Sequence, residues 1–169
     1  MTPPLRSPGL QVTEAGATGL VLTRDFAAPA PLVFAALTRP ELLRRWHGAH
    51  GWHLTGCEVD LRPGGAWRFV SHGPGGAEME MYGEFREVEP PVRLVQTEIH
   101  RGWPEGAALV TTVLAETGGH TTMTVTVRYP SPEIRDQVVR TPMRRGAGEA
   151  YDRLAALLDL LDQEKRDRS

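Results

Sequence analysis

The chain has 169 residues, of which 40% are apolar and 24% charged, and its formal net charge is -2. This length predicts one domain, because globular domains run to roughly 100–200 residues. The single cysteine, Cys57, excludes an intrachain disulfide. There is no apolar run of roughly 18 residues, which excludes a transmembrane helix, and residues 1–11 lack the apolar core of a secretory signal. We therefore expect a cytoplasmic protein that does not bind membranes.

The charged residues argue against nucleic-acid binding. The 19 basic residues are dispersed among 21 acidic ones, and no basic run is longer than a pair such as Arg44 and Arg45. A surface that follows phosphates needs a basic stripe or cluster. The sequence therefore predicts no nucleic-acid partner.

The N-terminal part is expected to contain a tail, a strand and two helices. Residues 1–17 are rich in proline and glycine and are predicted to be a flexible tail. A first strand is expected over residues 20–26, followed by short helices over 32–37 and 40–46. Thr38 is placed to cap the second helix, with Pro40 at an early helical position. Residues 47–57 are glycine-rich and predict a loop.

The middle of the chain predicts an antiparallel meander. Strands separated by turn residues are expected over residues 58–61, 66–71, 78–88, 93–99, 109–115 and 121–129. Residues 79–86 and 122–129 alternate between apolar and polar side chains. Such alternation indicates a sheet with one wet face and one covered face.

The C-terminal part predicts the cover of that sheet. Ser131, Pro132 and Glu133 form a helix start, and Pro142 is expected to interrupt the helix. An apolar stripe then runs from Ala147 to Leu161 at helical spacing. The predicted fold class is α+β, a helix-grip fold in which a curved antiparallel sheet wraps around a long C-terminal helix, with two short helices after the first strand. We place the domain at residues 18–163 and a polar tail at 164–169.

Several segments resemble a known superfamily. They are residues 24–29 (Arg-Asp-Phe-Ala-Ala-Pro), 33–46, 58–69 with Pro63-Gly64-Gly65, 87–95 around Pro90-Pro91, 102–106, 129–131 and 148–154. Together they span residues 19–161, and the chain is similar to SRPBCC (START-like, helix-grip) domains, in the branch named after the C-terminal domain of the heat-shock-protein-90 ATPase activator. The resemblance implies a cavity between sheet and helix that accepts apolar ligands. One departure is His47-Gly48-Ala49-His50, where the branch usually has an aromatic residue followed by Gly-Pro.

Three functions are compatible with this resemblance. The first is the binding of an apolar or aromatic small molecule in an internal cavity between the sheet and the C-terminal helix. The second is a cavity enzyme of the polyketide cyclase or hydrolase type. The third is an interaction module similar to a chaperone activator. Apolar residues on the terminal helix also allow a homodimer.

The candidate cavity residues are mainly aromatic side chains and methionines, which suit a flat apolar ligand. Simple filling of the core is the alternative role, and both stay open. One carboxylate joins them, because Glu98 shares a strand face with Leu94 and Gln96 and could serve as an acid or base in a dry pocket. The full set is Trp67, Phe69, Met81, Glu98, Trp103, Met123, Tyr129, Met143 and Tyr151.

Three histidines and the cysteine lie close together in the sequence. His47, His50 and His53 are spaced three apart, with Cys57 after them, and these residue types are zinc ligands. A solvated glycine-rich loop needs no metal, and spacing in loops is weakly diagnostic. We predict neither a metal nor a cofactor. No nucleophile motif surrounds Ser71 or Ser131.

Overall fold

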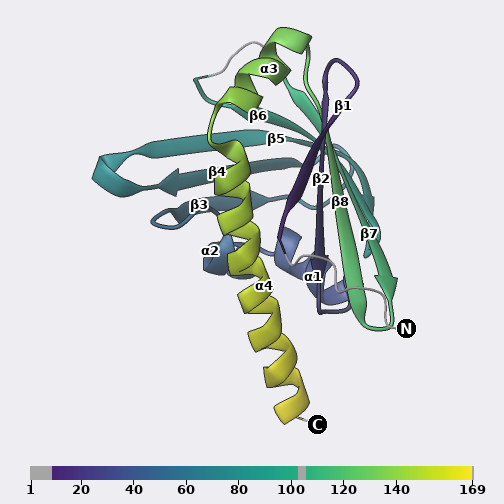
Figure 1. Ribbon diagram of the computed structural model, residues 1–169. Coiled ribbons are helices and arrows are strands. Elements are labelled where there is room, and N and C mark those ends of the chain that lie inside the picture. Colours follow the sequence, from purple (N-terminus) through teal and green to yellow (C-terminus); the bar gives the residue numbers. More distant parts are fainter. Residues whose placement is uncertain (1–8, 103–105, 169) are drawn as a thin grey trace.

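A computed structural model describes residues 9–102 and 106–168. Eight antiparallel strands form one sheet in the order β1-β2-β8-β7-β6-β5-β4-β3, and the sheet curves around the long helix α4 (Figure 1). The strands are β1 (Gln11–Ala15), β2 (Gly19–Phe26), β3 (His53–Val59), β4 (Ala66–His72), β5 (Glu78–Glu89), β6 (Arg93–His100), β7 (Ala108–Thr117) and β8 (His120–Arg128). The helices are α1 (Ala30–Thr38), α2 (Pro40–Trp46), α3 (Pro132–Arg140) and α4 (Met143–Asp167), with one 3-10 turn (Pro74–Gly76). The predicted α+β helix-grip fold is confirmed.

The N-terminal segment contains a strand that the sequence did not indicate. Residues 11–15, which we expected to lie in the tail, form β1 and pair with β2 from Gln11 opposite Thr23 to Ala15 opposite Gly19. Buried Arg135 of α3 fixes the turn between them, because its Nη1 donates to the backbone oxygens of Gly16 and Gly19 at 3.0 Å each. Because β1 precedes the strand that we expected to be first, the two short helices follow the second strand, β2, and not the first. An edge strand with so few apolar side chains has little periodicity to detect.

The strand expected at residues 58–61 lies earlier, at β3. Its register against β4 shifts between Leu54 and Gly56, which inserts an extra residue. As a result Leu54 and Cys57 are both buried although they are three positions apart. Such a bulge breaks the period of two that sequence analysis relies on, so this stretch was wrongly assigned to a loop.

Proline positions define the helices as expected, with one correction. The Ser131 hydroxyl accepts a hydrogen bond from the Ile134 backbone N–H at 3.2 Å and caps α3, and the break at Pro142 separates α3 from α4. Thr38 does not cap α2, because its hydroxyl donates to the Phe34 carbonyl at 2.7 Å. Helix α4 continues to Asp167, through most of the stretch expected to be a tail.

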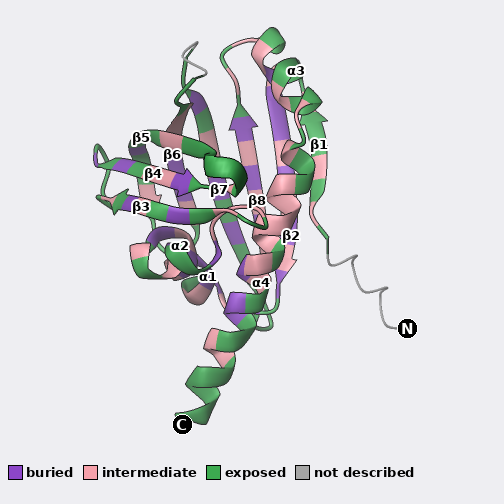
Figure 2. Ribbon diagram, turned by 90° about the vertical axis from the view of Figure 1, so that its left-hand side faces the viewer, coloured by how far each residue is buried: buried purple, intermediate pink, exposed green. Residues whose placement is uncertain are grey.

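The core occupies one half of the space between sheet and helix. Leu154, Leu157 and Leu158 of α4 are buried there against apolar side chains of α1 and α2 such as Val33 and Leu43. In Figure 2, buried residues on α4 are confined to its middle turns, while the preceding turns are only partly buried. None of the described helices is long and apolar enough to cross a membrane. The unfilled half is where a site can lie.

Candidate functional site

The pocket is produced by a change of side-chain size along α4. The turns that pack the core present leucines, whereas the turns before them line the pocket with the small residues Gly146, Ala147 and Ala150 beside the larger Met143 and Tyr151. Small side chains leave space, and a pocket of about 1070 Å³ results. Apolar residues of the sheet form the opposite wall: Leu22, Met79, Met81, Ala108, Val110, Val125 and Val127.

The loop after α2 closes one side of this pocket. Residues 47–50 and Trp52 line it. Arg153 of α4 holds the loop, because its Nη1 donates to the backbone oxygens of Gly48 at 2.8 Å, Ala49 at 3.3 Å and Trp52 at 3.2 Å. Glu149 of α4 forms a fourth hydrogen bond with the loop, since its carboxylate accepts from the His50 backbone N–H at 3.2 Å. The loop is therefore fastened to α4, which forms the neighbouring wall of the pocket.

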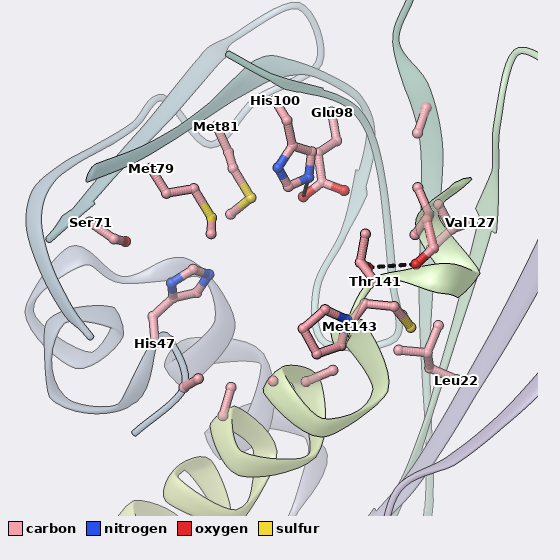
Figure 3. Close-up of a pocket in the computed structure, with 18 of the residues that line it drawn as sticks. Leu22, His47, Ser71, Met79, Met81, Glu98, His100, Val127, Thr141 and Met143 are labelled. Carbon is pink, nitrogen blue, oxygen red and sulfur yellow. Dashed lines mark hydrogen bonds and ion pairs between the residues drawn. The ribbon is translucent and has the colours of Figure 1, made fainter. Parts of the chain in front are cut away.

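Five of the nine candidate residues line the pocket: Met81, Glu98, Tyr129, Met143 and Tyr151. Figure 3 shows Met81, Glu98 and Met143 around the same space. Trp103 lies outside the described residues. The other three candidates, Trp67, Phe69 and Met123, do not line the pocket.

Trp67, Phe69 and Met123 have structural positions outside the pocket lining. The Trp67 indole crosses Gly83 and donates to the Thr97 carbonyl at 3.0 Å. A Cβ at Gly83 would lie 1.9 Å from that same oxygen, so only glycine fits. Phe69 packs against Trp67 at a ring-centroid distance of 4.9 Å. Met123 is 1% exposed, in the half of the sheet that α1 and the leucines of α4 fill.

His47 lines the pocket and has a buried ring nitrogen. Its ring packs edge-on against Phe69 at 5.0 Å and tilts against Trp46 at 5.4 Å. Its Nδ1 atom is buried without a hydrogen-bond partner among the described residues. Burial, reinforced by the positive charge of Arg153, lowers the pKa of His47 to about 4. At neutral pH this side chain is an uncharged imidazole with one donor and one acceptor.

Glu98 and His100 lie two residues apart on β6 and face the pocket together (Figure 3). Glu98 Oε1 is 3.9 Å from His100 Nε2, and the Glu98 side chain is 24% exposed. No described residue donates a hydrogen bond to this carboxyl, whose strand neighbour in β7 is Ala108. Burial raises the pKa of Glu98, and the nearby His100 imidazole opposes part of that effect. A carboxyl in such surroundings favours its protonated form.

Two tyrosines complete the polar set. Tyr129 follows β8 and Tyr151 belongs to α4, where it stacks on Trp46 at 6.2 Å. Burial, followed by the negative charge of Glu98, raises the pKa of each tyrosine to about 12. Both phenols therefore stay neutral over the physiological range, and neither hydroxyl has a hydrogen-bond partner within the described ranges.

The residues considered as metal ligands from the sequence do not form a metal site among the described residues. Cys57 is buried on β3, and His53 is exposed at the start of that strand. Within residues 9–102 and 106–168, no three His, Cys, Asp or Glu side chains are grouped so that they could hold a metal ion. Glu80 lies on the outer face, where its carboxylate receives 2.6 Å hydrogen bonds from Arg68 and Arg101. These two bonds, from Arg68 first, lower its pKa.

Sequence reasoning missed several pocket residues. His100 could have been found, since it shares the strand face of Glu98 at the next alternate position. Val125 and Val127 are signalled by the same alternation in β8. The loop histidines were considered as metal ligands and as ionisable residues of a cavity enzyme, but nothing in the sequence shows that the ring of His47 in particular turns inward. The contribution of α3, through Ile134 and Val138, also lacks a sequence signal.

Comparison with known proteins places this geometry in a family context. The family model described as Activator of Hsp90 ATPase homolog 1-like protein matches residues 27–159. A Rhodobacter sphaeroides crystal structure is 36% identical, covers 90% of this chain and 99% of its own, and has a TM-score of 0.85. A Nitrosomonas europaea structure is 30% identical with the same coverages and a TM-score of 0.78. CalU16 from Micromonospora echinospora shares the fold alone, at 22% identity, 78% and 75% coverage and a TM-score of 0.54. No curated protein matches the sequence.

Proposed function

Because this chain belongs to the family of Activator of Hsp90 ATPase homolog 1-like proteins, whose wider fold family includes ligand-binding and polyketide cyclase-like proteins, we propose that it binds an apolar or aromatic small molecule in the pocket beneath α4. The observation that carries the proposal is the pocket itself. It offers about 1070 Å³ between an apolar sheet face and the small side chains of α4, which is the size and character of a small-molecule site.

The distribution of side chains on α4 supports this function over simple structural packing. A helix whose only task is to cover a sheet gains stability from large apolar side chains at every inward position, at about 25 cal/mol per Å² buried. Helix α4 has leucines at 154, 157 and 158 but Gly146, Ala147 and Ala150 beside the pocket. Less apolar surface is therefore buried at these three positions, and a ligand in the pocket would increase that burial.

The test is binding of Nile red, an uncharged flat dye whose fluorescence rises in apolar surroundings. We expect saturable binding with one-to-one stoichiometry. Val110→Trp, on the pocket wall, should abolish it, while Leu109→Trp should not. Leu109 is the adjacent residue of β7, 40% exposed on the outer face, so the pair differs only in the face of the sheet. Ala147→Trp blocks the pocket from the opposite wall. Equal dye binding by the blocked and control variants would refute the proposal.

An acid–base enzyme is the second candidate, favoured by the Glu98–His100 pair at 3.9 Å. In such a reaction Glu98 would protonate a ketone oxygen while His100 Nε2 takes a proton from the adjacent carbon, giving an enol that returns to the ketone with a solvent proton. Incubating 2-acetylnaphthalene with the protein in D₂O tests this. Deuterium entering the methyl group with the wild type, and not with His100→Gln, supports it; incorporation at the buffer rate contradicts it.

A further inference from the structure

Hydrogen-bonding groups from four separate elements meet the pocket without a hydrogen bond to the described chain, although Glu98 lies 3.9 Å from His100. They are the His47 imidazole after α2, the Glu98 carboxyl on β6, the Tyr129 hydroxyl after β8 and the Tyr151 hydroxyl on α4. His47 Nδ1 is buried and unpartnered. A polar atom that is buried without a hydrogen bond, as His47 Nδ1 is, costs about 1–3 kcal/mol of stability. The Glu98 carboxyl and the two tyrosine hydroxyls face the same space. Their convergence on one space indicates that a polar ligand atom completes them.

The pocket also lacks a counter-charge for an ionised ligand. Arg145 is the one arginine among the described lining residues, and it is 84% exposed at the rim, paired with Glu149 at 3.1 Å. Further inside, Glu98 faces the His100 imidazole at 3.9 Å and apolar neighbours. A bound carboxylate would therefore meet another carboxyl, with no lysine or arginine among the described residues inside the pocket. An apolar wall with isolated hydrogen-bonding groups suits an uncharged molecule.

Building on the binding function proposed above, we propose that the pocket selects an uncharged apolar molecule bearing a carbonyl oxygen, and that the Glu98 carboxyl donates a hydrogen bond to that oxygen. The carboxyl is the donor best placed to accomplish this, because no group of the described chain holds it as an acceptor. His47 and the two tyrosines provide further neutral hydrogen-bonding groups around the same ligand.

The proposal predicts a direction for the effect of pH. Above its pKa, Glu98 loses the proton that it donates and repels the carbonyl oxygen, so ketone affinity should fall as pH rises through that raised pKa. The other titratable or charged groups facing the pocket are His100 on the same strand, His47 and His50 of the loop after α2, Tyr129, Tyr151, and the Arg145–Glu149 pair at the rim. His47 gains a proton only near a pKa of about 4, and the tyrosines lose theirs only near a pKa of about 12.

Equilibrium dialysis with four probes on one ring system tests the proposal. The probes are 2-acetylnaphthalene, 2-ethylnaphthalene, 2-naphthoate and 1-(2-naphthyl)ethylamine, each measured between pH 5 and pH 8. We expect the ketone to bind about five- to tenfold more tightly than the ethyl compound at pH 5, the gain of one hydrogen bond. That advantage should shrink as the pH rises, and the anion and the cation should bind more weakly than the ketone.

Two substitutions at one position make the test specific. Glu98→Gln keeps a donor at every pH, so ketone binding should persist but lose its pH dependence. Glu98→Leu has no donor, so the ketone should bind no better than the ethyl compound. Circular dichroism establishes that each variant is folded, and Glu98→Gln alone suffices if the leucine variant is not.

The outcomes separate the two proposals. Three outcomes overturn the assignment of Glu98 but leave ligand binding intact. The ethyl compound binds as tightly as the ketone, naphthoate or the amine binds best, or Glu98→Gln retains the pH dependence of the wild type. If none of the four probes binds the wild type, the binding function is overturned, and this inference with it.

Discussion

Replacing Ala147 by leucine measures whether the space beside α4 is open. Ala147 lines the pocket, so the three added carbon atoms enter free volume. Each buried CH₂ contributes about 0.8 kcal/mol, and fixing the leucine rotamer costs about 0.5–1 kcal/mol. The free energy of unfolding should therefore rise, by up to about 1.5 kcal/mol if all three carbons are buried.

The matched control is the same substitution at Ala36, which also lies on a helix but is 0% exposed in the filled half of the core. Overpacking at such a position costs about 1–3 kcal/mol. Urea denaturation followed by circular dichroism gives both values. The reasoning is refuted if Ala147→Leu destabilises the protein as much as Ala36→Leu does, because the pocket would then be closed in solution.

Three further predictions concern the surroundings of the pocket. A Cβ at Gly83 would lie 1.9 Å from a backbone oxygen of β6, whereas a Cβ at Gly148 would meet nothing within 4 Å. Gly83→Ala should therefore lower the free energy of unfolding by several kcal/mol, and Gly148→Ala should raise it by about 0.5–1 kcal/mol. Similar urea midpoints for the two variants would contradict this prediction. Arg153→Ala removes the hydrogen bonds to three backbone oxygens of the loop. Amide hydrogen exchange over residues 48–52 should therefore accelerate at least tenfold. Exchange rates equal to those of the control Arg145→Ala would show that Arg153 does not hold the loop. The pKa of His47 falls from 6.5 in the unfolded chain to about 4 in the folded one, so below pH 6.5 the unfolded chain binds a proton that the folded protein does not, and stability falls as pH falls. Between pH 6.5 and pH 5 the wild type should lose about 1.5 kcal/mol relative to His47→Phe. Parallel stability curves for the two proteins would contradict the burial of a neutral imidazole.

The sequence was sufficient for the architecture because its strongest signals are local. Alternation in β8, the cap at Ser131 and the break at Pro142 each depend on neighbouring residues alone. The strands that were missed or displaced lack such signals. β1 has few apolar residues, and in β3 the bulge between Leu54 and Gly56 disrupts the period of two.

The site was harder to predict because it depends on where the interior is filled. Met123 and Val127 share one face of β8, yet Met123 is packed under α1 and the leucines of α4 while Val127 lines the pocket. Alternation identifies the inner face but not the half of it that stays open. The change from Leu154 to Ala150 and Ala147 along α4 is visible in the sequence, and it is the feature that locates the pocket.

The most direct test of this account is a crystal structure of the protein grown with 2-acetylnaphthalene. The account predicts density for the ring system between α4 and the inner face of the sheet, with the ketone oxygen about 3 Å from a Glu98 carboxyl oxygen. Side chains filling that space, or the ketone bound only on the outer surface, would contradict it.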